Sequence, residues 1–410
     1  MDGKYYGRNI FPVIIASLSI FAASYNIATI SVGLASIESI FHLQGSEVTL
    51  LTSAILMGAI FGAILSGIFS DRFGRIGILT VDLVTFVLAG IGSSLSINFI
   101  EIFIFRFMVG IGVGIDYVVV FAYLSEVELL SGRGSRRLTI VMFFANFGIL
   151  MAYASGAILS LFYHSLAWRY VFLSGAVLSI IPILLRLKVT DTDEWKLNHH
   201  RKITYIIREF YSGKNRRDGV KFSIPWFLYQ ISDQSLTLFL PLLLFSIAGN
   251  SLFSSDLGSV EVKIFTIPAS LITIMIIGRV GRRFLQSLGF ALRGLFLGIM
   301  GVLLIYGFQL PLYISVFLLG GAFFFGALGP DKTTVISPAE SFKTRIRATG
   351  QGFSEMFGRI GGLTGVLIYG YLRYFQPGTG LIFLSITCLL GLISTIIFFG
   401  WRISPDRIIS

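Results

Sequence analysis

The chain has 410 residues, of which 55% are hydrophobic and 13% are charged, and its mean hydropathy is +0.84. Soluble domains use roughly 45–50% apolar and about 25% charged residues, so this composition excludes a water-soluble fold of this length. The net charge of +11 would suggest a nucleic-acid partner in a soluble protein, but the basic residues here gather in alternate loops, a pattern that indicates membrane topology.

Apolar stretches of about 20 residues recur along the chain, and each is long enough to cross a bilayer core as a helix. The first lacks a small-residue cleavage site, so we expect it to be retained rather than removed as a signal peptide. The stretches predict an all-α, multi-pass protein of the cell membrane. Its twelve transmembrane helices are expected near residues 10–38, 48–70, 77–97, 102–125, 138–162, 168–187, 222–248, 258–278, 284–307, 311–336, 348–372 and 379–401.

Lysine and arginine are distributed unevenly among the predicted loops. Loops rich in both alternate with loops that hold little basic charge beyond Arg169, Lys263 and Arg373. Because basic loops stay on the cytoplasmic side of a membrane, both termini are predicted to be cytoplasmic.

One polar connection separates two sets of six predicted helices. We expect an N-terminal six-helix bundle at 1–187, a cytoplasmic linker at 188–221 and a C-terminal six-helix bundle at 222–410. Within the linker, residues 203–211 can form a short amphipathic helix on the inner membrane surface, or the whole segment can be a solvated connection.

The two halves repeat each other in two places. Gly74 and Gly281 follow corresponding helices 207 residues apart, and Glu126 and Glu340 precede basic clusters 214 residues apart. Two repeats at nearly one offset indicate duplication of a six-helix unit. Two such halves around a central cavity are a common transporter plan.

Short basic loops at 67–75 and 278–283 join the second helix to the third and the eighth to the ninth. Glycine permits a tight turn, and opposite charges can hold neighbouring helix ends together. We predict that these loops close an inward-facing gate, the alternative being a topology anchor without a gating role. The predicted gating residues are Gly67, Asp71, Arg72, Gly74, Arg75, Glu126, Arg133, Gly281, Arg282, Glu340 and Arg345.

Asp116 lies about ten residues inside an otherwise apolar helix. An ionised carboxylate at that depth costs about 2.5–3.5 kcal/mol unless it is protonated or paired. Asp116 is therefore the first candidate for a proton carrier during alternating access, and a structural hydrogen bond to a neighbouring helix is the alternative. The adjacent Tyr117 offers a hydroxyl to the substrate or to Asp116, or serves packing.

The loop Gly67–Arg75 matches the signature Gly-x-x-x-Asp-Arg-x-Gly-Arg-[Arg/Lys] of the major facilitator superfamily, except that Ile76 replaces the last basic residue. The chain resembles that superfamily over essentially its whole length. Residues 106–126 and 329–361, with Trp168-Arg169 before the sixth helix, are similar to the phosphate:proton and related metabolite:proton symporters. The resemblance implies the major facilitator fold and proton-coupled transport of a small solute.

Some positions depart from that branch. Its acidic residues in the first helix fall at Ala23 and Asn26, and its Trp-x-x-x-Asp pattern in the seventh helix ends at Gln230. The positions that the resemblance ties to proton handling or substrate contact, Ala23, Asn26 and Gln230, have thus lost their charge. Asp233, about one turn from Gln230, is a candidate to replace the missing acid.

Arg359 stands where the branch has a lysine, and Asp331 stands where it has an asparagine. A guanidinium facing a cavity suits an oxyanion, and the alternative is an internal ion pair with Asp116, Asp331 or Glu355. Asp82 and Arg293 are interpreted as structural. The predicted proton-coupling residues are Asp116 and Asp233. The predicted substrate-binding residues are Tyr117, Asn146, Trp226, Tyr229, Gln230, Gln234, Asp331 and Arg359.

We expect a secondary active transporter that moves a small solute with protons, in the first place an anion such as phosphate. Symport of another metabolite, such as an organic acid or a sugar, and uniport are alternatives, and a transporter-derived sensor without transport is a further, less favoured one. All four histidines fall in predicted loops and no zinc-protease, nucleophile-elbow or nucleotide phosphate-loop motif occurs, so an enzyme and an ATP-driven pump are excluded. The single Cys388 excludes a cysteine metal cluster. We expect no cofactor and no nucleic-acid partner, only substrate, protons and lipid, with the monomer as the functional unit.

Overall fold

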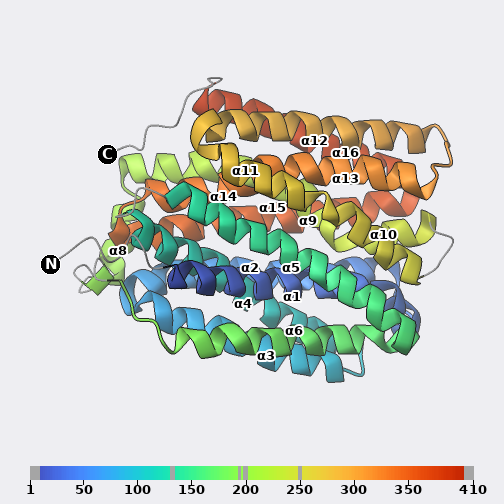
Figure 1. The fold of residues 1–410 in the computed structure, drawn as a ribbon, viewed down its shortest axis with the longest axis horizontal. Coiled ribbons are helices and arrows are strands. Elements are labelled where there is room, and N and C mark those ends of the chain that lie inside the picture. Colours follow the sequence, from blue (N-terminus) through green and yellow to red (C-terminus); the bar gives the residue numbers. More distant parts are fainter. Residues whose placement is uncertain (1–9, 130–133, 193–194, 197–201, 248–251, 401–410) are drawn as a thin grey trace.

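The computed structural model describes residues 10–129, 134–192, 195–196, 202–247 and 252–400, and every regular element within them is a helix (Figure 1). Six long helices precede residue 187 and run up and down the molecule: α1 (Phe11–Phe41), α2 (Gly45–Phe73), α3 (Arg75–Leu95), α4 (Phe99–Leu129), α5 (Gly134–Tyr163) and α6 (Ala167–Arg186). After the connecting helix α8 (Ile203–Phe210) follow α9 (Gly213–Ile247), α10 (Leu252–Ile264), α11 (Thr266–Val280), α12 (Arg282–Ile305), α13 (Leu312–Leu328), α14 (Pro330–Ser341), α15 (Arg347–Phe375) and α16 (Pro377–Phe399). The short 3-10 turns are His164–Leu166 and Thr344–Ile346.

Nine stretches of the described residues are long and apolar enough to cross a membrane, and one of them joins α5 and α6. The pairs α10–α11 and α13–α14 each form one stretch. Helices α9 and α15 have membrane-spanning length but carry more polar side chains, and those deep in the bundle are buried, among them Gln230, Gln234, Glu355 and Arg359. Together the described helices make twelve crossings, which confirms the predicted all-α architecture.

Glycine lets the helices pack closely. A Cβ atom added to Gly58 of α2 would lie 1.9 Å from the carbonyl oxygen of Phe107, and one added to Gly110 of α4 would lie 2.1 Å from that of Ile55. The backbones of α2 and α4 therefore touch, as expected for membrane helices with small residues at their interface. Gly329 ends α13 and begins α14, so this crossing is a broken helix rather than a straight one. A Cβ atom at Gly329 would lie 1.9 Å from the carbonyl oxygen of Leu285 on α12, so the break also lets these helices pack closely.

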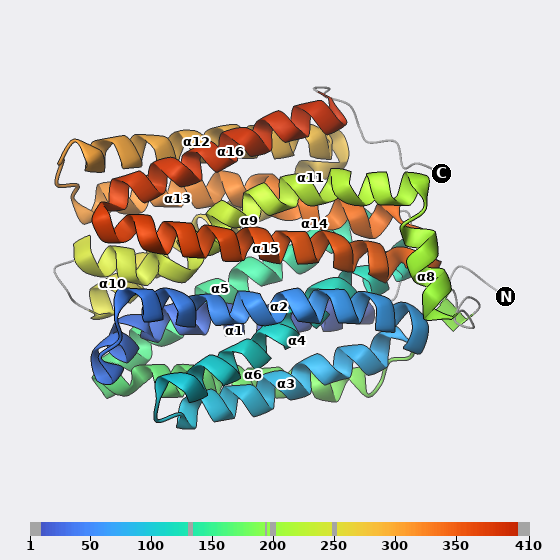
Figure 2. The ribbon, with the colours of Figure 1, turned by 180° about the vertical axis from the view of Figure 1, so that it is seen from behind.

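Helix α8 and the turns that join α2 to α3 and α11 to α12 lie at one end of the bundle (Figures 1 and 2). We call it the inner end, because the predicted basic loops gather there, and the opposite end the outer end. The predicted segment 203–211 forms the helix Ile203–Phe210, and its Ile206 and Phe210 pack against Phe342 and Ile346. Helices α2 and α15 lie side by side and join the two halves (Figure 2).

Candidate functional site

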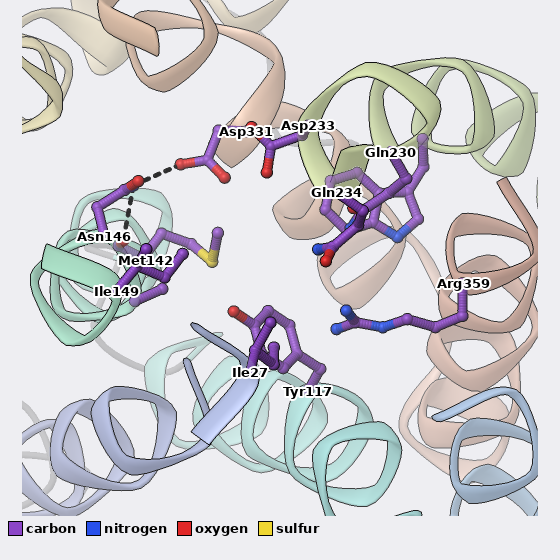
Figure 3. Close-up of a pocket in the computed structure, with 12 residues that line it drawn as sticks. Ile27, Tyr117, Met142, Asn146, Ile149, Gln230, Asp233, Gln234, Asp331 and Arg359 are labelled. Atoms are coloured by element: carbon purple, nitrogen blue, oxygen red, sulfur yellow. Dashed lines mark hydrogen bonds between the residues drawn. The ribbon is translucent and has the colours of Figure 1, made fainter. Parts of the chain in front are cut away.

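A small polar cavity of about 20 Å³ lies between the two halves. Helices α1, α4 and α5 line it from one half, and α9, α14 and α15 line it from the other (Figure 3). Eight predicted site residues line this cavity: Tyr117, Asn146, Trp226, Gln230, Asp233, Gln234, Asp331 and Arg359. The remaining lining residues are Ile27, Met142, Ala145 and Ile149. Trp226, Gln230, Asp233 and Gln234, which stand at three- and four-residue spacing on the seventh predicted helix, line the cavity together from α9.

Arg359 is held by an internal ion pair. Its Nη2 lies 2.5 Å from Oε1 of Glu355, one turn earlier on α15, and both side chains are almost fully buried. The Trp226 indole donates a hydrogen bond of 2.9 Å to the other Glu355 oxygen. The guanidinium carbon also lies 4.7 Å from the centroid of the Tyr117 ring. The predicted alternative, neutralisation of Arg359 by Glu355, is the arrangement found.

Asp331 connects the halves across the cavity. The side-chain nitrogen of Asn146 on α5 donates a hydrogen bond of 2.7 Å to Asp331 Oδ2 on α14 (Figure 3). The same oxygen lies 3.0 Å from Lys332 Nζ, which also donates to the carbonyl oxygen of Ala327 at 2.6 Å. Asp331 therefore faces the cavity with its charge compensated from behind.

Asp233 is arranged in the same way. Its Oδ1 accepts a hydrogen bond of 3.0 Å from the Tyr229 hydroxyl and lies 3.3 Å from Arg293 Nη2. Arg293, which was expected to be structural, thus supports a residue of the cavity wall. Tyr229, a predicted substrate-binding residue, lies behind Asp233 and outside the lining of the cavity.

Asp116 does not line the cavity but belongs to a buried cluster in the N-terminal half. Its Oδ1 accepts hydrogen bonds from the Ser19 hydroxyl at 2.5 Å and from Arg186 Nη2 at 2.9 Å. The other terminal nitrogen of Arg186 lies 2.6 Å from Asp82 Oδ1. The second oxygen of each carboxylate has no hydrogen-bond partner within the described part of the chain. Asp82 is therefore part of this cluster, and four helices meet there.

At the inner end, Asp71 of α2 reaches across to the first turn of α15. It accepts hydrogen bonds from the Thr349 amide at 2.8 Å and the Thr349 hydroxyl at 2.6 Å, and from the Ala348 amide at 3.3 Å. These bonds place a carboxylate at a helix N-terminus, where the amides and the helix dipole favour negative charge. The predicted gate loop therefore joins the two halves in this conformation.

Arg75 lies beside Asp71 and is completely buried. Its guanidinium lies 2.9 Å from Asp71 and 2.7 Å from Glu126, and it donates to the carbonyl oxygen of Thr344 at 3.2 Å. The carboxylate of Asp191, just after α6, accepts from the Arg75 amide at 2.5 Å and so caps α3. This contact of Asp191 was not predicted, because acidic residues are common in solvated linkers whether or not they make a specific contact.

The C-terminal half carries matching contacts. Gly74 and Gly281 both have positive φ angles, 110° and 87°, which explains the glycines at the two turns. Arg282 forms an ion pair with Glu340, the counterpart of the Arg75–Glu126 pair.

The remaining predicted gate residues lie apart from these pairs. Arg345 pairs instead with Glu209 of α8, at 2.5 Å. Arg72 is half-buried, and its guanidinium carbon lies 5.7 Å from the ring centroid of Phe73. The predicted gating residue Arg133 lies outside the described residues.

Two half-bundles around an enclosed polar cavity, with buried charge clusters and a contact that closes one end, define a multi-pass membrane transporter. The family model described as "Sugar (and other) transporter" matches residues 12–218 and 223–400. The chain belongs to this family, within the major facilitator superfamily, and the family comprises transporters rather than enzymes.

Individual relatives differ in the solutes they are named for. The chain is 25% identical over 467 residues to Inorganic phosphate transporter 1-11 of Oryza sativa subsp. japonica, covering 93% of this chain and 84% of that protein. It is also 25% identical over 395 residues to a D-xylose transporter of Levilactobacillus brevis, covering 88% and 85%. A solved structure of the proton:xylose symporter XylE bound to 6-bromo-6-deoxy-D-glucose matches with a TM-score of 0.83 and 17% identity, over 100% of this chain and 98% of that chain. The predicted fold is thereby confirmed.

Proposed function

We propose that this chain is a secondary active transporter that carries a small, uncharged, hydroxylated metabolite together with a proton. One observation carries this choice: Asp233, Asp331 and Arg359, the ionised side chains of the cavity wall, each have a partner of opposite charge. An anion would enter beside two carboxylates without an unpaired cation among the described lining residues. It would lose its hydration with little compensation, whereas a neutral solute exchanges hydrogen bonds at a lower cost.

The polar groups of the cavity suit hydroxyls. The Asp233 and Asp331 side chains are each 12% exposed and accept hydrogen bonds, while Arg359 is only 1% exposed. The side-chain amides of Gln230 and Gln234 each retain an atom without a hydrogen-bond partner in the described structure. A hydroxyl both donates and accepts, so it matches amides and carboxylates alike. A sugar or polyol also offers C–H faces to the apolar side chains of the opposite wall.

The cluster of Asp82, Asp116 and Arg186 supports proton coupling. With both carboxylates ionised, the cluster has a net charge of −1 in a fully buried site, which is costly inside a membrane. One proton on the pair makes the cluster neutral. Because Asp116 precedes Tyr117 of the cavity wall, proton binding and substrate binding act on the same turn of α4.

The contacts at the inner end support alternating access. Asp71 holds the first turn of α15 by hydrogen bonds that water can replace once the halves separate. The ion pair of Arg75 with Glu126 lies within the N-terminal half and can persist during that movement, while the hydrogen bond from Arg75 to the Thr344 carbonyl oxygen must break. The predicted gating role of these residues is part of this proposal.

Symport of an anion such as phosphate is the second candidate. The similarity to the rice phosphate transporter extends over 93% of this chain and favours it. It requires Arg359 to leave Glu355 and bind the anion during transport. Whether Arg359 stays paired with Glu355 or binds the solute in the loaded cavity therefore separates the two candidates.

Uptake by purified protein in proteoliposomes tests the proposal. A panel of radiolabelled pentoses, hexoses, polyols and inorganic phosphate is measured with and without an inwardly directed proton gradient. We expect accumulation of a neutral hydroxylated solute that the gradient increases and that excess phosphate does not inhibit. Accumulation of phosphate alone would establish the second candidate, and uptake without any response to the gradient would contradict proton coupling.

A further inference from the structure

We propose that Lys263 is a second proton-binding group of the transporter, separate from the Asp116 cluster and situated on the outer side of the cavity. The inference adds a site to the proposed proton coupling. It is nevertheless tested with protons alone, so it stands or falls independently of the identity of the solute.

Lys263 is buried near the end of α10 and lacks the partners that an ammonium requires. Its side chain is 1% exposed, and Nζ lies 4.2 Å from the centroid of the Phe323 ring on α13. Among the described residues its side chain forms no hydrogen bond and no ion pair, and the Phe323 ring is the one cation–π contact that favours its ammonium form. An ammonium has three donors, and leaving them unmet in a buried site is expensive, whereas the neutral amine avoids that cost. The sequence interpretation, which placed this lysine in a loop, was wrong.

The charges around Lys263 come from three neighbouring helices. Asp233 of α9 and Asp331 of α14 attract its positive charge, while Arg293 of α12 and Lys332 of α14 repel it. Each of these acids already pairs with one of these cations. Lys263 is thus the surplus cation of the group, so its proton can leave without stranding a carboxylate.

A second buried acid lies between Lys263 and the outer end. Asp256 precedes Lys263 on α10 by seven residues, about two helical turns, so both project from a similar face. Asp256 is 2% exposed, and its side chain forms no hydrogen bond or ion pair with the described residues. Tyr153 of α5 is the titratable group near it, and the Tyr153 hydroxyl donates to the Thr237 carbonyl oxygen at 2.5 Å.

These groups form a series that leads from the outer end towards the cavity. A proton that reaches the Lys263 amine converts it to an ammonium and adds one positive charge beside Asp233 and Asp331. Both of these carboxylates line the cavity, so the charge on Lys263 changes the field that a bound solute experiences. Proton arrival from outside and substrate binding are linked through this change.

The test uses proteoliposomes of the full chain on a solid-supported membrane, where a step in external pH produces a charge displacement when protons bind inside the protein. No substrate is added. For the wild type we expect two transitions across a pH series, one from each proton site. Lys263→Met should remove one of them, and Asp116→Asn should remove the other. The matched control is Lys221→Met, because Lys221 also lies over an aromatic ring, Phe399 at 4.8 Å, but near the inner end.

Lys263→Arg makes the test independent of folding defects in the methionine variant. Arginine keeps the positive charge and cannot release its proton, so this variant should lose the same transition as Lys263→Met. Folding is checked by size-exclusion chromatography. A folded Lys263→Arg variant with the wild-type pair of transitions overturns the proposal, as does a Lys221→Met variant that loses the same transition.

Discussion

Gly67 of α2 allows the two halves to touch at the inner end, and Gly67→Ala should open that end. A Cβ atom at this position would lie 2.7 Å from the carbonyl oxygen of Ala348 on α15. The neighbouring Gly352 and Thr349 Cα atoms would be only 3.3 Å away. The obstacles are backbone atoms, so no side-chain rotation relieves the contact and the helices must separate.

The size of the effect follows from this geometry. Carbon atoms pack at about 3.5–4.0 Å, so α2 and α15 must move apart by nearly 1 Å at this point. Overpacking of this kind costs roughly 1–3 kcal/mol. The cost applies only to the conformation in which the inner end is closed, so the equilibrium should shift roughly 5–150-fold towards an inward-open form.

Cysteine labelling measures that shift. In a Cys388→Ala background, a cysteine replaces Met142 of the cavity wall and is labelled by an impermeant maleimide from the inner side. Gly67→Ala should raise the labelling rate by that factor. Gly77→Ala is the matched control, since a Cβ atom there meets nothing within 4 Å. An unchanged or lower rate for Gly67→Ala, or an equal rise for Gly77→Ala, would refute the argument.

Three further predictions concern the buried charges. Asp116→Asn leaves Asp82 and Arg186 as a neutral pair, so solute exchange should persist while accumulation driven by a proton gradient is lost. Loss of exchange as well would contradict a role of Asp116 in proton coupling alone. Arg186→Leu leaves the buried carboxylates of Asp82 and Asp116 without a cation and should lower the free energy of unfolding by about 3–5 kcal/mol. The loss should be smaller at low pH, where protonation removes the carboxylate charges, and thermal unfolding in detergent at two pH values measures both effects. Glu355→Gln removes the partner of Arg359 and should lower the dissociation constant for phosphate at least about tenfold, or about 1.4 kcal/mol in binding free energy. Isothermal titration calorimetry measures this constant, and an unchanged value would contradict the role given to the Arg359–Glu355 pair.

The sequence predicts the number and position of the helices well because membrane crossing imposes a simple rule of length and apolarity. The first expected span, 10–38, corresponds to α1, Phe11–Phe41. Polar residues inside apolar stretches were also informative, since the membrane tolerates them only at interior positions. Gln230 and Gln234 of the cavity wall, and Asp116, are such polar residues inside apolar stretches.

The partners of those residues were harder to predict. Arg186 ends a predicted span, where a basic residue also serves topology, and nothing in the sequence links it to Asp82 on another helix. Glu355 is different, because its four-residue spacing from Arg359 was visible and is typical of an ion pair within one helix. Long-range pairing depends on helix rotation and depth, which composition does not specify.

Helices α2 and α15 approach each other closely near both ends of the bundle. Near the outer end a Cβ atom on Gly370 would lie 2.7 Å from the Thr49 side chain, and near the inner end Gly67 meets Ala348 in the same way. The seam is therefore tight at both ends, and the hydrogen bonds across it between described residues lie at the inner end, through Asp71 and through the Thr349 hydroxyl and Gly67 carbonyl. Rocking about such a seam separates one end while the other stays packed, so the order of opening depends on the small free energies of these terminal contacts. A proton or a solute bound in the cavity needs to change that balance by only a few kcal/mol to select the side that opens.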